Sequence, residues 1–133
     1  MTDTILEKSR EFILDTDKSW NYILPVDFYH KYYKTDKKYL LVDLRDKKSY
    51  KKFHIKNSIN IFWMDILKDH NLKKIPKNKK IFLICYVGHT SSQIMVLLRL
   101  LGYNAISIKF GYGVSPAFEV PVAGWINYNY PVV

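Results

Sequence analysis

Two short runs of apolar residues constrain the fold of this chain more than any other feature of its sequence. Residues 38–44 (KYLLVDL) and 80–85 (KIFLIC) lack the alternation of polar and apolar residues that marks a strand with one wet face. Strands that are apolar on both faces are typical of parallel sheets with helices packed on either side. The two runs therefore predict an α/β protein with a mainly parallel sheet.

Helical patterns and shorter apolar runs occupy the segments around these two strands. Asp3 or Thr4 suits the N-cap of a first helix. Pro25 suits the first position of the next helix, and Gly102 the end of the last one. That last helix is apolar on almost every side, so we expect it to be heavily buried. The expected helices span residues 4–14, 25–34, 46–53, 62–70 and 91–101, and the additional strands span 22–24, 59–61 and 105–109.

The chain of 133 residues suits one hydrophobic core, so we expect one domain overall: an N-terminal helix and lead-in over 1–21, and the main fold over 22–133. A formal charge of +9 favours anionic partners. Nucleic acid is not an expected partner, because the lysines are dispersed and only three residues are Arg, the usual reader of bases and phosphates. Residues 1–14 lack the apolar segment of a signal peptide, and no apolar stretch approaches the ~20 residues of a membrane span.

Cysteine usage limits the chemistry that the chain can perform. Cys85 is the only cysteine, so we expect no intramolecular disulfide and a reducing, cytoplasmic compartment, with an exported mature domain as the open alternative. The four histidines show no spacing typical of metal ligands. We therefore expect neither a metal nor a cofactor.

Cys85 ends the second buried strand, and a short loop with Gly88 at its centre follows it. Ligands of open parallel sheets bind beyond the carboxyl ends of the strands. The loop can curl so that its backbone N–H groups, at the start of a helix, converge on the sulfur. Such donors stabilise a thiolate and also a persulfide anion, which makes Cys85 a candidate nucleophile that carries sulfur. The simpler interpretation, a small apolar residue at a strand end, has weight because free cysteines are often buried.

The residues after Cys85 have structural and functional interpretations. Ser91 and Ser92 suit the N-cap of the following helix, and Ser91 is also a candidate donor to the bound sulfur. We expect Tyr86 and Val87 to form the wall of the pocket. His89 is expected to face solvent, with a charged role in the loop as the less favoured alternative.

Five segments occur in a characteristic order and spacing: 41–46 (LVDLRD), 54–61 (HIKNSINI), 85–91 (CYVGHTS), 100–103 (LLGY) and Gly111. Together they resemble a single-domain rhodanese, and the resemblance covers roughly residues 22–133. It implies a rhodanese-like, doubly wound α/β fold of about five mainly parallel strands with helices on both faces. It also implies a persulfide-forming Cys85 and sulfurtransferase or sulfur-carrier activity, with a small anionic sulfur donor and a thiol, cyanide-like or protein acceptor.

The resemblance also implies which residues surround the sulfur. Asp43 and Arg45 border the pocket in the family, and we favour an ion pair that anchors the loop over direct contact with substrate, since charges near a strand end are usually paired. The candidate catalytic residue is Cys85. The candidate substrate-binding residues are Tyr86, Val87, Gly88, His89, Thr90, Ser91, Asp43 and Arg45.

Three departures from the family pattern affect this interpretation. Thr90 stands where many rhodaneses have Arg, so the charge that would recognise thiosulfate is missing. Phe53 replaces the usual Gly, and residues 111–125 form a longer closing segment that we expect to reshape the mouth of the pocket. The missing Arg favours the alternative of a non-catalytic binding or redox-sensing module. A phosphatase is disfavoured, because the loop lacks the additional residue and the Arg that would clamp a phosphate dianion.

Overall fold

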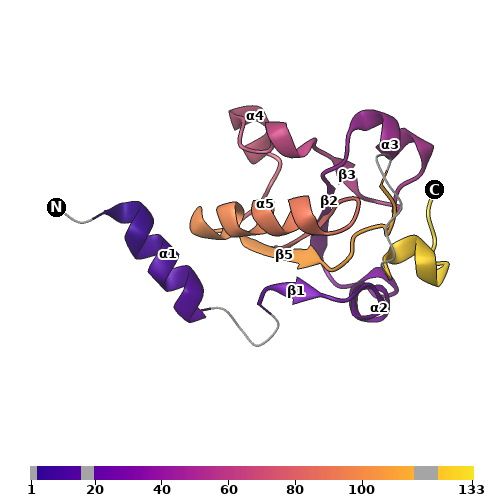
Figure 1. The fold of residues 1–133 in the computed structure, drawn as a ribbon, viewed down its shortest axis with the longest axis horizontal. Helices are drawn as coiled ribbons and strands as arrows, with labels where there is room; N and C mark the ends of the chain where they lie inside the picture. Colours follow the sequence, from indigo (N-terminus) through magenta and orange to yellow (C-terminus); the bar gives the residue numbers. More distant parts are fainter. Residues whose placement is uncertain (1–2, 16–19, 116–122) are drawn as a thin grey trace.

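The structure, a computed structural model, describes residues 3–15, 20–115 and 123–133 (Figure 1). Five strands of these segments form one sheet in the order β1-β5-β4-β2-β3, and each neighbouring pair is parallel. This arrangement confirms the α/β class and the parallel sheet of about five strands. The strands are β1 (Tyr22–Ile23), β2 (Tyr39–Asp43), β3 (Ile59–Asn60), β4 (Lys80–Ile84) and β5 (Asn104–Ile108).

Local signals mark the ends of several helices. The Asp3 carboxylate caps the first helix by accepting the N–H groups of Ile5 and Leu6, at 3.0 and 3.2 Å. Pro25 occupies the first position of the second helix, as expected. Gly102 follows the last long helix with φ +93°, a conformation that favours glycine. The helices are α1 (Thr4–Asp15), α2 (Pro25–Phe28), the π-helical η1 (Tyr29–Tyr33), α3 (Lys47–Lys52), the 3₁₀ turn η2 (Trp63–Asp65), α4 (Asp69–Leu72), α5 (His89–Leu100) and the 3₁₀ turn η3 (Trp125–Tyr128).

Two of the expected helices were placed wrongly. The helix expected over 62–70 is divided into η2 and α4, because Lys68 adopts an extended conformation at φ −64° and ψ 141°. Helix α5 begins two residues earlier than expected, since Gly88 and not a serine is its N-cap. The hydroxyls of Ser91 and Ser92 instead donate back to the Gly88 carbonyl, at 3.2 and 2.6 Å.

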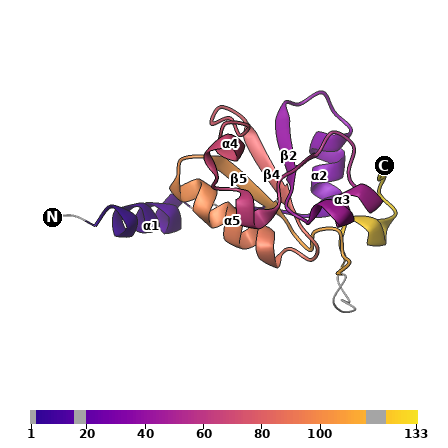
Figure 2. The ribbon, with the colours of Figure 1, turned by 90° about the horizontal axis from the view of Figure 1, so that it is seen from above.

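Helices cover both faces of the sheet (Figures 1 and 2). Side chains of β4 alternate between two apolar cores, with Leu83 and Cys85 on one side and Phe82 on the other. The first core includes the buried side of α5. The second is aromatic and packs Phe28 of α2 and Trp125 of η3 against the sheet. Cys85 therefore faces α5.

Helix α5 is not buried on all sides. Met95 and Leu98 are 2% and 0% exposed, whereas Leu97 and Leu101, on the outer side, are 42% and 47% exposed. The expectation of heavy burial was therefore wrong for this side of the helix. Its apolar composition does not by itself decide which positions pack.

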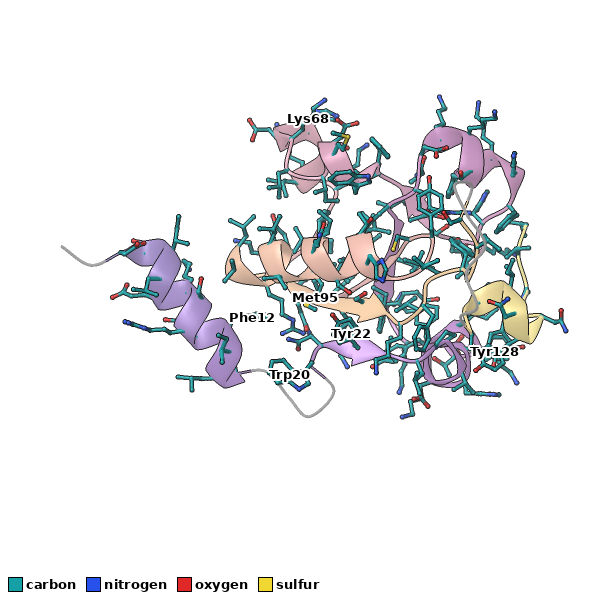
Figure 3. The ribbon with its side chains drawn as sticks, viewed as in Figure 1. Phe12, Trp20, Tyr22, Lys68, Met95 and Tyr128 are labelled. Carbon is teal, nitrogen blue, oxygen red and sulfur yellow. The ribbon has the colours of Figure 1, made fainter. Side chains whose placement is uncertain are left out.

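Helix α1 lies at one side of the molecule, near the end of α5 (Figure 1). Phe12 packs against the first core, and Figure 3 shows it on the side of α1 that faces α5. Ile5 and Ile13 of the same helix are 74% and 62% exposed. Within the segments that the structure describes, no helix has the length and apolar character needed to cross a membrane.

Candidate active site

Cys85 follows the central strand β4, and the loop after it returns to its sulfur. The Sγ atom accepts the backbone N–H groups of Gly88 and Ser91, at 3.1 and 3.3 Å. The Cys85 thiol donates to Ser91 Oγ at 3.4 Å. Two amides therefore donate to Sγ at the start of α5, an arrangement that favours negative charge on sulfur, and once the thiol is ionised the Ser91 hydroxyl can rotate to become a third donor.

Gly88 makes the curl of this loop possible. Its φ of +97° is a conformation that L side chains rarely adopt, and a Cβ at this position would lie only 2.9 Å from the backbone nitrogen of Phe110. Glycine is therefore required at the tightest point of the loop. Any side chain here would displace the amide that donates to Cys85.

A buried pair of hydroxyls lies behind the sulfur. Ser91 Oγ and Ser107 Oγ are 2.7 Å apart, and both serines are 0% exposed. Because Ser92 already donates to the Gly88 carbonyl at 2.6 Å, the Ser91 hydroxyl can turn towards Sγ while Ser107 donates to it. The sequence interpretation missed Ser107. The sequence feature that could have identified Ser107 is a polar residue at an inward position of β5, on the side that faces α5.

Asp43 and Arg45 form a buried ion pair beside the loop. They are 0% and 1% exposed, and Arg45 Nη2 lies 2.9 Å from Asp43 Oδ2. Arg45 Nη2 also donates to the carbonyl of Phe53 at 2.6 Å, and its guanidinium lies over the Phe53 ring. The residue that replaces the family's usual Gly thus helps to enclose this charge. The pair is buried and links β2 to the segment at Phe53.

Tyr112 connects the ion pair to the loop and was not singled out from the sequence. Its hydroxyl donates to Asp43 Oδ2 at 2.8 Å and accepts the N–H of Ile55 at 3.0 Å. Burial, followed by the charge of Asp43, raises the pKa of Tyr112, so its hydroxyl stays protonated as a donor. Its own N–H donates to the Cys85 carbonyl at 3.0 Å.

The next backbone contact extends this support to Tyr86. The N–H of Gly113 donates to the Tyr86 carbonyl at 2.9 Å. The chain passes very close to the loop at Gly111, where a Cβ would lie 2.2 Å from the Cys85 oxygen. Residues 111–113 therefore hold the base of the cysteine loop, and glycine at 111 is required by this close approach.

Tyr86 is half-buried, and its hydroxyl donates to a carboxylate oxygen of Asp46. The same carboxylate caps α3 by accepting the N–H of Ser49 at 2.8 Å. The hydrogen bond from Tyr86 is the main reason that the pKa of Asp46 is lowered, with the Ser49 amide next. Burial is the main reason that the pKa of Tyr86 is raised. The first residue of the loop is thus tied to the start of α3.

The remaining candidate residues lie at the outer side of the loop. His89 is exposed, while Val87 and Thr90 are half-buried. The expected effect of the segment 111–125 on the mouth of the pocket concerns residues 116–122, which lie outside the described residues. Across 3–15, 20–115 and 123–133, no group of three or more His, Cys, Asp or Glu side chains is placed to hold a metal ion.

These features define a class of protein: a parallel α/β domain that presents one cysteine, within an amide-lined loop, at the carboxyl end of its central strand. The family model for the rhodanese-like domain matches residues 29–113, more than half of the chain. The protein belongs to the rhodanese-like domain family.

Curated relatives match about half of this chain. A tRNA sulfurtransferase from Pyrobaculum aerophilum is 34% identical over 70 residues, which are 53% of this chain and 14% of that protein. The adenylyltransferase and sulfurtransferase uba4 from Ogataea parapolymorpha is 38% identical over 72 residues, which are 53% of this chain and 18% of that protein. The chain thus spans less than a fifth of the length of either relative.

Solved structures share the fold over most of the chain. A rhodanese-related protein from Thermoplasma volcanium has a TM-score of 0.66 and 27% identity, covering 84% of this chain and 95% of its own. A protein from Bacillus halodurans has a TM-score of 0.70 and 22% identity, covering 96% of this chain and 85% of its own.

Proposed function

We propose that this protein is a sulfurtransferase or sulfur carrier that holds sulfur as a persulfide on Cys85. The observation that carries the proposal is the pair of N–H groups, from Gly88 and Ser91, at 3.1 and 3.3 Å from Sγ. Backbone donors fixed by a loop stabilise an anion without reorganising during the reaction. The same donors suit the thiolate before sulfur uptake and the persulfide after it.

The proposed reaction has two steps. With thiosulfate as donor, the Cys85 thiolate attacks the outer sulfur of thiosulfate, an S–S bond forms, and sulfite leaves with the electron pair of the broken S–S bond. The resulting persulfide anion, Cys85–S–S⁻, is then attacked at its outer sulfur by a thiolate or cyanide. The Cys85–sulfur bond breaks, the acceptor leaves with the sulfur, and the thiolate is regenerated.

The identity of the sulfur donor is the more specific part of the proposal. Thr90 brings no charge to the loop, and Arg45 is committed to Asp43 and Phe53. Recognition of a sulfonate group therefore depends on backbone amides and hydroxyls alone. A neutral or smaller sulfane-sulfur donor suits this loop better than thiosulfate, and slow sulfur carriage suits it better than rapid turnover. The curated relatives with sulfurtransferase names support sulfur transfer in general.

Intact-mass measurement tests the proposal. The reduced protein, incubated with excess thiosulfate or with an inorganic polysulfide, is expected to gain one sulfur atom that cyanide removes. Cys85→Ser is expected to gain none, because the serine hydroxyl does not form the corresponding adduct. The proposal fails if Cys85→Ser gains the same cyanide-labile sulfur, or if neither donor modifies the wild-type chain.

A second candidate is a non-catalytic binding or redox-sensing module. The observation that favours it is the 2% exposure of Cys85, together with the uncharged Thr90. Sulfur uptake from a polysulfide separates the two candidates. A sulfur carrier gains a cyanide-labile sulfur on Cys85, whereas a binding module gains none.

A further inference from the structure

An open groove of about 630 Å³ lies at the end of the sheet opposite Cys85. It is bordered by the chain segments that lead into β2 and β4, which enter the sheet from the same end (Figure 2). Its volume falls in the range of sites for small ligands. Five lysines line it together with Tyr32: Lys37, Lys38, Lys77, Lys79 and Lys80.

The groove is separate from the cysteine loop. Lys80 begins β4, and Cys85 follows the last residue of that strand. At ~3.3 Å per residue, the two positions lie roughly 17 Å apart along the strand. A small sulfur donor bound at Cys85 cannot reach these lysines. The inference from the groove therefore stands independently of the proposed sulfur transfer.

No carboxylate of the described residues forms an ion pair with the lysines of the groove. Within the described residues, Lys31 and Lys68 form ion pairs with carboxylates, but none of the five groove lysines does. Asp36 precedes Lys37 in the chain and still makes no such pair. Since like charges at one site repel each other, an arrangement of this kind favours binding of an anion.

Several of these lysines contact tyrosine side chains and not carboxylates. The ammonium group of Lys37 lies over the Tyr32 ring, 5.1 Å from its centroid. Lys80 donates to the Tyr32 hydroxyl at 2.7 Å. Lys77 lies over the ring of Tyr103 at 5.2 Å. Cation–π contacts orient an ammonium group and leave its positive charge available to a ligand.

We propose that this groove binds a linear chain of phosphate groups. Lysine binds phosphate as a point charge, and no arginine lines the groove to select a planar carboxylate. An adjacent groove of about 370 Å³ shares Tyr32, Lys80 and Asn104 with it and is also lined by Arg99, so positive charge continues beyond the first groove. A ligand with several closely spaced negative charges matches this surface better than a single anion does. Its source is a free oligophosphate or the backbone of a nucleic acid.

Calorimetric titration with sodium tripolyphosphate at low ionic strength tests the proposal. The double variant Lys77→Gln/Lys79→Gln is expected to raise the Kd at least tenfold. The control Lys51→Gln/Lys52→Gln removes the same charge from exposed positions of α3 and is expected to change the Kd less than twofold. Equal effects of the two variants would show that only the overall charge of +9 attracts the anion, and would overturn the proposal.

Two further ligands identify the source of the phosphates. A single-stranded oligonucleotide that binds more tightly than tripolyphosphate, and loses affinity in the groove variant, assigns the site to a nucleic-acid backbone. Weaker oligonucleotide binding assigns it to a free oligophosphate. Hexaglutamate that binds as tightly as tripolyphosphate overturns the preference for phosphate. Both double variants are expected to form the Cys85 persulfide as wild type does. Loss of phosphate binding and loss of persulfide formation are therefore measured separately.

Discussion

At the scale of single residues, the groups that contact the Cys85 sulfur within the described part of the chain are neutral amides and a hydroxyl. The amides of Gly88 and Ser91 are fixed by the backbone, whereas the Ser91 hydroxyl can rotate. Ser107 is fully buried behind Ser91. When the Ser107 hydroxyl donates to Ser91 Oγ, the Ser91 hydroxyl is free to donate to the sulfur. Rotation of the Ser91 hydroxyl therefore lets the same residue accept from the thiol or donate to the thiolate or persulfide.

Ser91→Ala is expected to slow formation of the persulfide and to leave the fold intact. Loss of one hydrogen bond to an anionic sulfur costs about 1 kcal/mol, or about a fivefold slower formation of the sulfur adduct. The measurement is the rate of sulfur uptake by intact mass. Ser92→Ala is the matched control, because its hydroxyl bonds to the Gly88 carbonyl and is not a donor to the sulfur. Equal rates in the two variants would refute a role for the Ser91 hydroxyl.

The contact between Tyr86 and Asp46 predicts a pH dependence of stability. The pKa of Asp46 is lowered from 3.8 in the folded protein, so the contact stabilises the fold above the unfolded value and loses this effect as pH falls through the folded pKa. Asp46→Asn keeps a capping side chain but loses the charge. The difference in Tm between wild type and Asp46→Asn is expected to be constant above about pH 5 and to shrink below about pH 4.

Asp36→Asn is the control for this pH series. Asp36 is exposed, and Asp46, not Asp36, accepts the hydroxyl of Tyr86. The Tm of Asp36→Asn is expected to differ little from that of wild type at every pH. A Tm difference for Asp46→Asn that grows on acidification would contradict the sign of the predicted effect.

At the scale of elements, the segment that follows β5 fastens the cysteine loop to the rest of the sheet. Tyr112 contributes its N–H to the Cys85 carbonyl and its hydroxyl to both Asp43 and Ile55. The loop is thereby held by β5 and β2 as well as by β4. Its geometry depends on contacts between segments that are far apart in the chain.

Tyr112→Phe is expected to reduce the free energy of unfolding by about 1–3 kcal/mol. The change keeps the ring under Arg45 but leaves the Ile55 amide and a carboxylate oxygen of Asp43 without the phenol. Urea denaturation measures the loss. Tyr128→Phe, at a position 49% exposed, is the control and is expected to change the free energy of unfolding by less than about 0.5 kcal/mol. A Tyr112→Phe effect no larger than that of the control would contradict the role of this hydroxyl.

The same distinction between near and distant contacts explains what could be predicted from the sequence. The strands 38–44 and 80–85 and the glycine at the centre of the loop follow from local patterns, and the structure contains all three. The break at Lys68 carries no Gly or Pro signal and was missed. Tyr112 was also missed, because its bond to Asp43 spans 69 residues of sequence and exists only after the sheet has formed.

At the scale of the whole molecule, the parallel sheet separates two regions of different chemistry. Its carboxyl end presents the sulfur of Cys85, and its amino end presents the lysine groove. Helix α1 adds neither an active-site residue nor a buried side chain to this arrangement. Its position was not predicted, because the sequence of a helix does not specify the surface against which the helix packs.

The near-complete enclosure of the Cys85 side chain, which is 2% exposed, has a consequence for partner choice. Any sulfur that bonds to Sγ must come within the ~2.05 Å of an S–S bond. A small donor can make that approach through a small opening, whereas a thiol fixed on the surface of a second folded protein needs the loop to open more widely. Enclosure therefore selects by size, so that a reactive thiol can accept sulfur from small molecules with little crosslinking to other proteins.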